Sequence, residues 1–126
     1  MTEEDRKILA SDPDGLRCYE YLANNIEDCD QDIDIIIDNI ARADINGQFS
    51  ASAARYLHAI DAEKYAGPVN RLVEVAIERD REHRYLADIL QSLYGNDYEA
   101  RAKELNSIDN NFRRIYKRLF PSTDSL

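Results

Sequence analysis

A three-four alternation of apolar and small residues is the feature that most constrains how this chain can fold. The positions that share it are Tyr19, Leu22, Ile26, Cys29, Ile33, Ile36, Ile40 and Ala43. Residues three and four apart lie on one face of a helix, so the alternation predicts a single narrow apolar seam. We therefore expect one helix over residues 16–46. Asn24 and Asn25 are poor helix formers, and a break between them stays open as an alternative.

Glycine and proline residues divide the rest of the chain into further helical segments. The expected segments are an N-terminal helix and turn over 1–14, bundle helices over 16–46, 51–65, 68–94 and 97–120, and a frayed tail over 122–126. Thr2 and Asp5 have the spacing of a capping box at the start of the first helix. No segment has the period-two alternation of a strand, and no internal repeat is evident. The expected fold is all-α, a single-domain antiparallel four-helix bundle with a short extra N-terminal helix.

The formal net charge of −9 is concentrated in the first part of the chain. Residues 1–50 contain 13 acidic and 4 basic residues, whereas residues 51–126 contain 12 of each. An acidic surface is repelled by nucleic acid phosphates and by anionic membranes, so neither is expected as a partner. No apolar run approaches the roughly 18 residues of a membrane span, and the N-terminal residues lack the pattern of a signal peptide. We therefore expect a cytoplasmic protein.

The two cysteines, Cys18 and Cys29, are expected to be buried core residues. In a continuous helix they lie about 16 Å apart along the axis. A disulfide requires Cα atoms within about 7 Å, so the two thiols cannot pair inside that helix.

An acidic face and a basic face are the main candidate interaction sites. The acidic face consists of Asp28, Asp30, Asp34 and Asp38, and the basic face consists of Arg113, Arg114, Lys117 and Arg118 in the last helix. Aspartates four residues apart repel one another, so a compensating interaction is expected. With the two helices antiparallel, Asp30 would lie near residue 113. Three interpretations stay open: a solvated acidic face, pairing within the molecule, and pairing with another chain.

Metal and catalytic sites have weaker support. His58 with Asp61, and Asp80 with His83, have the helical spacing of carboxylate-histidine metal sites. On neighbouring helices, however, the two pairs would be about 10 Å out of level. The chain has no Gly-x-Ser-x-Gly turn and no glycine-rich phosphate loop. We therefore expect no cofactor, no resident metal and no enzymatic activity.

The leading functional hypothesis is a non-enzymatic protein–protein interaction module or a self-associating subunit, such as a homodimer. Its basis is the combination of amphipathic helices with an acidic helix face and no catalytic motif. One alternative is an acidic inhibitor or immunity-type protein that blocks a basic cleft. A second alternative is a helical bundle that binds a metal through carboxylates and histidines.

Overall fold

The computed structural model describes residues 1–121. Within this range the chain is all-α, as predicted, with eight α-helices and one short 3₁₀ helix. Their bounds are α1 Glu3–Ala10, α2 Leu16–Asn24, η1 Asp30–Asp32, α3 Ile33–Ala43, α4 Gln48–Asp61, α5 Ala66–Arg79, α6 Leu86–Tyr94, α7 Ala102–Ile108 and α8 Asn110–Leu119. None of the helices in this range combines the length and the apolar character that a membrane span requires. The predicted tail over 122–126 lies outside the described residues.

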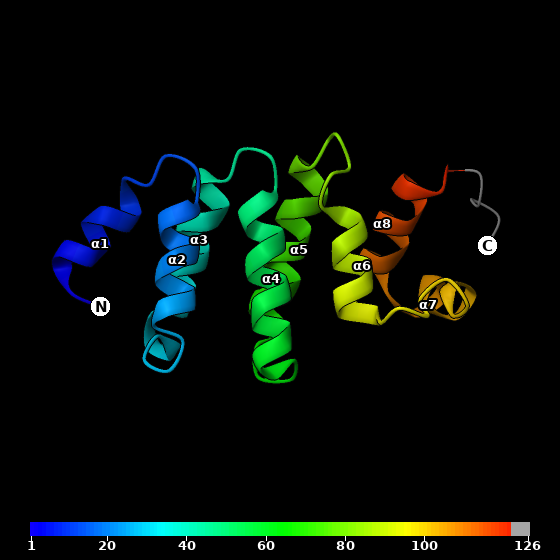
Figure 1. Ribbon diagram of the computed structural model, residues 1–126, viewed down its shortest axis with the longest axis horizontal. Coiled ribbons are helices and arrows are strands. Elements are labelled where there is room, and N and C mark those ends of the chain that lie inside the picture. The colour runs from blue at the N-terminus through cyan, green and yellow to red at the C-terminus, as the bar shows by residue number, and fades with distance from the viewer. Residues whose placement is uncertain (122–126) are drawn as a thin grey trace.

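Six of the helices stand as three pairs in a row (Figure 1). The pairs are α2 with α3, α4 with α5, and α6 with α8. The first helices of the pairs, α2, α4 and α6, pack side by side in one layer, and α3, α5 and α8 form a second layer behind them. At one end α1 packs on the first pair, and at the other end α7 packs on α8. The predicted four-helix bundle is not confirmed, because the helices are shorter, more numerous and arranged in a row.

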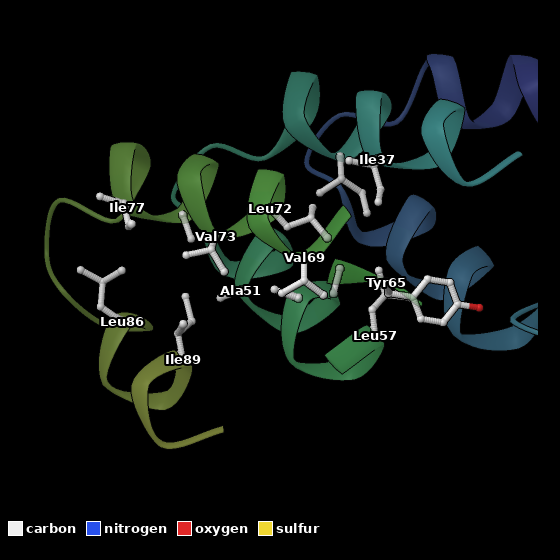
Figure 2. Packing of buried hydrophobic residues seen from close by; sticks show 14 of the residues in the cluster. Ile37, Ala51, Leu57, Tyr65, Val69, Leu72, Val73, Ile77, Leu86 and Ile89 are labelled. Atoms are coloured by element: carbon white, nitrogen blue, oxygen red, sulfur yellow. The ribbon is translucent and has the colours of Figure 1, made fainter. Parts of the chain in front are cut away.

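One hydrophobic cluster joins the three pairs. All eight α-helices contribute buried side chains to it. In the middle of the row, Leu57 of α4 and Leu72 of α5 are fully buried, and Leu86 and Ile89 of α6 continue the cluster towards the third pair (Figure 2). Because each pair packs only on its neighbours, the molecule is built like a short helical-repeat protein.

The prediction of one helix over 16–46 is wrong, because the helix is interrupted at Asn24 and Asn25. Asn25 ends α2, with both its backbone N–H and its side-chain amide donating to the Tyr21 carbonyl. Cys29 lies in the connection before η1 and is still buried. The residues of the apolar seam therefore face the core on both sides of the break, although the helix itself is interrupted. Their regular spacing suggested one continuous helix for this reason.

Two other predicted helices are also divided. The segment 68–94 forms α5 and α6, separated by a charged connection over residues 80–85. The segment 97–120 forms α7 and α8, because Asp109 has extended backbone and its carboxylate caps α8. The predicted helix over 51–65 corresponds to α4, which begins and ends a few residues earlier. The capping box of Thr2 and Asp5 is confirmed at the start of α1.

A buried aspartate begins each of the three pairs. In each case its carboxylate accepts a hydrogen bond from the backbone N–H six residues further along the chain. The three contacts are Cys18 N to Asp12 at 2.9 Å, Ser50 N to Asp44 at 2.8 Å and Leu86 N to Asp80 at 3.1 Å. Three residues after each aspartate the backbone is left-handed, at Gly15, Gly47 and His83 respectively. The structure therefore contains an internal repeat that the sequence analysis did not identify.

In each of the first two pairs, an arginine near the end of the second helix donates a hydrogen bond to the aspartate that precedes the first helix. Arg42, near the end of α3, donates to the backbone carbonyl of Asp12 at 3.4 Å. Arg79, at the end of α5, donates to the backbone carbonyl of Asp44 at 2.6 Å. In both pairs, the end of the second helix is tied to the aspartate that precedes the first helix. This second shared contact supports the structural equivalence of the pairs.

Candidate functional site

A shallow groove of about 490 Å³ crosses the layer of α2, α4 and α6. The residues that line it are Tyr19, Ser52, Arg55, Tyr56, Ala59 and Ser92. Arg55 donates to the Ser92 hydroxyl at 2.8 Å and lies 4.0 Å from Asp88. The Tyr56 hydroxyl donates to the Ala23 carbonyl at 3.3 Å. These contacts link side chains of three neighbouring helices. Arg55, Tyr56 and Ser92 each keep part of their surface exposed.

The two sides of α4 differ in residue size. Its buried residues are mostly small, Ser50, Ala51, Ala53 and Ala54, with Leu57 as the large one. The larger side chains, Arg55 and Tyr56, lie on the outer side of the helix. Aromatic and arginine side chains on an outer face are typical of protein-binding surfaces.

A second hollow, of about 230 Å³, lies between the second and third pairs. The residues that line it are His58, Ala62, Ala66, Val69, Asn70, Val73, Leu93, Tyr94, Asp109 and Asn111. They come from α4, α5, α6, the beginning of α8 and the turn after α4. We call this hollow the Asp109 pocket. It combines aliphatic walls with a few polar groups, which is the usual composition of a ligand site.

The polar groups of the Asp109 pocket are fixed by hydrogen bonds. Asp109 caps α8 by accepting from the Phe112 N–H at 3.0 Å, and it accepts from the Tyr94 hydroxyl at 2.9 Å. Burial and the neighbouring Asp109 carboxylate raise the pKa of Tyr94 well above its usual value. Asn111 donates through its side-chain amide to Asn70 at 2.8 Å. Tyr94 is therefore a neutral hydroxyl at physiological pH, and Asp109 is the acidic residue of the pocket.

The structure gives internal partners to part of the predicted acidic face. Asp30 accepts from the Lys64 ammonium at 2.7 Å and from the Tyr65 hydroxyl at 3.0 Å. The hydrogen bond from Lys64, followed by that from Tyr65, lowers the pKa of Asp30. Asp38 pairs with Arg71 of α5. Pairing within the molecule is therefore present, but its bases come from α5 and from the turn between α4 and α5.

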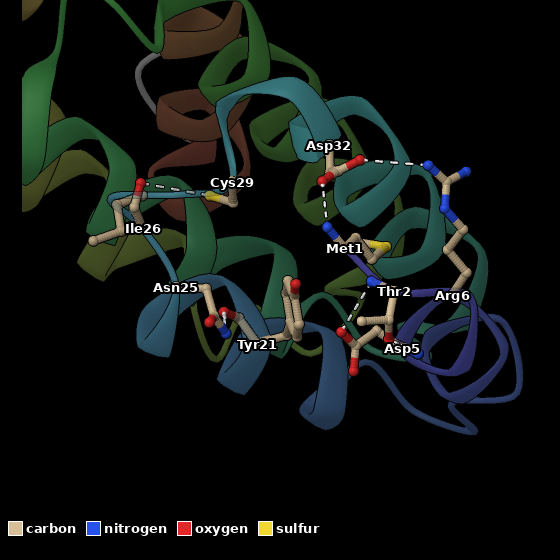
Figure 3. Close-up of polar contacts among 9 residues, drawn as sticks. All are labelled: Met1, Thr2, Asp5, Arg6, Tyr21, Asn25, Ile26, Cys29 and Asp32. Carbon is tan, nitrogen blue, oxygen red and sulfur yellow. Dashed lines mark hydrogen bonds and ion pairs between the residues drawn. The ribbon is translucent and has the colours of Figure 1, made fainter.

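The rest of the acidic segment is divided between paired and free carboxylates. Asp32 lies 3.2 Å from the Met1 amino group and 3.6 Å from Arg6 (Figure 3). Asp28 and Asp34 are exposed, and neither has an ion pair within 4.0 Å among residues 1–121. These two side chains are the part of the predicted acidic face that stays free for a partner.

The structure does not pair the acidic face with the last helix, which was the intramolecular arrangement considered among the three open interpretations. In the row, α5 lies between α3 and α8, and α3 makes no contact with α8. Arg113 donates instead to Asn110 at 2.6 Å, Arg118 to the Arg114 carbonyl at 3.2 Å, and Arg114 to Asn111 at 3.5 Å. Lys117 is exposed on the same helix. The four basic residues therefore lie together on α8, towards the opposite end of the molecule from the acidic face.

The structure does not bring the metal candidates together. His58 lines the Asp109 pocket, and Asp61 at the end of α4 accepts from the Lys64 N–H at 3.0 Å. Asp80 and His83 lie beyond the other end of α5, a helix of 14 residues that spans about 20 Å. Across residues 1–121, no group of three or more histidine, cysteine, aspartate or glutamate side chains could hold a metal ion.

Both cysteines are free and buried, as predicted. The Cys18 thiol donates to the Leu9 carbonyl, with 3.6 Å between the sulfur and the oxygen. Burial, together with the neighbouring Asp12 carboxylate, raises the pKa of Cys18 to about 12. Because the thiolate is the reactive form, Cys18 is a structural residue and not a nucleophile.

Most of the polar residues of the Asp109 pocket had no predicted role. Asn70 lies in α5, Tyr94 in α6, and Asp109 and Asn111 at the start of α8, so only tertiary packing places these three segments together. One local signal was available. The run from Asp109 to Asn111 consists of three poor helix formers that are good N-caps, in the middle of a predicted helix. Function has to be inferred from this geometry, since no protein-family model, no curated protein and no solved structure matches the chain.

Proposed function

We propose that this protein is a non-enzymatic protein-interaction module that binds its partner across the layer of α2, α4 and α6. The observation that carries the proposal is the groove lined by Tyr19, Arg55 and Tyr56 on a row of helix pairs. Rows of helix pairs present extended surfaces with side chains from several neighbouring helices, and such surfaces commonly bind proteins. Tyrosine and arginine are enriched among the residues that dominate binding energy.

The charge distribution supports a partner with a basic surface. The net charge is −9, and the excess of acidic residues lies in residues 1–50, which include the first helix pair. Such a field accelerates association with a positively charged protein and weakens with added salt. Binding is therefore expected to be tighter at low ionic strength.

A photocrosslinking experiment tests the binding face. The photoreactive amino acid benzoylphenylalanine replaces Ser52, in the groove, or Glu74, an exposed residue of α5 in the other layer. We expect crosslinked products from position 52 only, and we expect Tyr56→Ala, which removes an aromatic side chain of the groove, to reduce them about tenfold. Equal products from both positions, or none from position 52, would contradict the proposal. The mass of the product separates a second copy of this chain from another protein.

The second candidate is an acidic inhibitor that blocks a basic cleft through the first pair. The specific observation in its favour is that Asp28 and Asp34 are exposed without an ion pair among residues 1–121. The same crosslinker at Asp34 distinguishes the two candidates. Products from position 34 that disappear when Asp28 is changed to asparagine would favour the inhibitor, and products from position 52 alone would favour the groove.

A further inference from the structure

The Asp109 pocket contains a carboxylate that pairs with no basic side chain among residues 1–121. Asp109 is the acidic side chain that lines it, and it forms no ion pair within residues 1–121. One carboxylate oxygen accepts from the Phe112 N–H and the other accepts from the Tyr94 hydroxyl. Both donors are neutral. A carboxylate has about four acceptor positions, so acceptor capacity remains for a further donor.

An anion does not fit this pocket, although the pocket adjoins the N-terminus of a helix. The partial positive charge at the start of α8 already interacts with the capping carboxylate of Asp109. An incoming anion would lie beside that carboxylate and be repelled. A group with a positive charge and several donors is the complementary ligand.

The shape and the walls of the pocket restrict what carries that charge. Val69, Val73 and Leu93 form aliphatic walls, and the volume of about 230 Å³ suits a short alkyl chain. The acceptors on the lining are few. They are Asp109, the Tyr94 oxygen and two asparagine oxygens that already accept hydrogen bonds, that of Asn70 from Asn111 and that of Asn111 from Arg114. An ammonium has three donors, whereas a guanidinium has five in a planar fork and would leave donors unpaired. The other titratable groups on the lining are His58 and Tyr94.

We propose that the Asp109 pocket binds a primary ammonium group carried on a short alkyl chain. The ammonium donates to Asp109, and the alkyl chain packs against the valine and leucine side chains. Either a lysine side chain of a bound protein or a free small alkylamine supplies this chemistry. The site lies apart from the groove of α2, α4 and α6, so it stands or fails independently of the proposed protein-binding face.

Side-chain amide signals in a ¹H–¹⁵N NMR titration test the proposal, because Asn70 and Asn111 both line the pocket. The probe is n-butylammonium at millimolar concentrations, and the matched neutral probe is n-butanol. We expect saturable shifts of both amides with the ammonium and at least tenfold weaker binding of the alcohol. Equal binding of the two probes, or no saturable shift with the ammonium, would overturn the proposal.

The variant Asp109→Asn removes the charge of the side chain without removing the N-cap of α8. Asparagine is as good an N-cap as aspartate, and its oxygen can still accept from the Phe112 N–H, so α8 is retained. We expect the variant to bind n-butylammonium about tenfold more weakly, the usual loss when a charged acceptor is removed. Asp97→Asn, outside the pocket, is the control and should bind as the unchanged protein does. Unchanged binding by Asp109→Asn would refute the assignment.

Two further probes separate the sources of the ammonium. Nα-acetyl-lysine amide carries the ammonium as a protein would, and its Nε-acetylated form lacks the charge. Binding of the first compound and not of the second supports a lysine side chain of a partner. Binding of n-butylammonium without binding of either lysine compound supports a free alkylamine.

Discussion

Two regions of this molecule use aspartate in opposite ways. Just before the first helix of each pair, Asp12, Asp44 and Asp80 are buried and accept hydrogen bonds from backbone N–H groups. Between the second and third pairs, Asp109 is only half-buried and lines a pocket. Asp12 and Asp80 each accept from three backbone N–H groups, whereas Asp109 accepts from one backbone N–H and from the Tyr94 hydroxyl, so Asp109 keeps more acceptor capacity for a ligand.

The structural aspartates also differ among themselves. Asp80 accepts from three backbone N–H groups, those of Arg84, Tyr85 and Leu86. Asp44 accepts from one, and its second oxygen has no hydrogen-bond partner in the described structure. The connection after α5 therefore depends more on its aspartate than the connection after α3 does.

The largest expected effect is that of Asp80→Ala. It leaves three N–H groups at the start of α6 without an acceptor, so we expect a loss of about 3 kcal/mol or more in the free energy of unfolding. Asp44→Ala removes one such contact, and we expect a loss nearer 1 kcal/mol. Urea denaturation measures both. If Asp80→Ala prevents folding, Asp80→Asn serves in its place. A larger loss for Asp44→Ala than for Asp80→Ala would contradict the ranking.

Two glycine variants are expected to change stability in opposite directions, one in the repeated turn and one outside it. Gly47 has a φ of +85°, and a Cβ there would lie 3.2 Å from the Ala76 backbone. We expect Gly47→Ala to destabilise the protein by about 1–3 kcal/mol. Gly67 lies in α5 with no atom within 4 Å of an added Cβ. Gly67→Ala should stabilise by roughly 0.5–1 kcal/mol. Thermal unfolding of the two variants checks this; a shared sign would refute it.

The acid sensitivity of the first pair is a smaller effect. Burial acts to raise the pKa of Asp12, but hydrogen bonds from Cys18, Asp14 and Gly15 hold it below its usual value. A carboxylate with a lowered pKa in the folded state stabilises above its unfolded pKa of about 3.9, and this contribution is lost as the pH falls through the folded value. Asp12→Asn should therefore destabilise at neutral pH, with a difference from the unchanged protein that shrinks in acid. A difference constant from neutral to acidic pH would show that the charge of Asp12 does not contribute.

The smallest effects are expected on the exposed acidic face. Asp38 pairs with Arg71, but both side chains are at least half exposed. Such pairs contribute about 0 to 1 kcal/mol, so Asp38→Asn should change the free energy of unfolding by less than about 1 kcal/mol. Asp34→Asn, which removes no ion pair, is the control with an effect near zero. If Asp38→Asn lost as much free energy of unfolding as the variants of the buried aspartates, the distinction between exposed and buried aspartates would be wrong.

Local signals in the sequence predicted the parts of the fold that depend on neighbouring residues. The capping box at Thr2 follows from backbone chemistry within a few residues, and the structure has it. The breaks at Asn25 and Asp109 also had local signals, but the apolar periodicity on both sides suggested continuity. Apolar periodicity shows which residues face the core. The same residues still face the core when a helix ends and the chain turns back, so the periodicity does not show where a helix ends.

The repeat and the pocket depend on information that is not local. The third pair has His83 where the first two have glycine, so the repeated turn does not appear as a repeated sequence. The Asp109 pocket brings Asn70 beside Asn111, which are 41 residues apart. Only the packing of the second pair on the third determines that contact. The candidate residues found from sequence were mostly exposed charges, because those are visible without knowledge of the packing.

The most direct test of the difference between the two regions is urea unfolding of Asp80→Asn and Asp109→Asn, with n-butylammonium chloride or sodium chloride at equal ionic strength. A ligand that binds only the folded state raises the free energy of unfolding. We predict that Asp80→Asn is much less stable but still stabilised by the ammonium, whereas Asp109→Asn keeps its stability within about 0.5 kcal/mol and loses the response. Equal destabilisation of both variants, or an ammonium response that survives in Asp109→Asn, would contradict it.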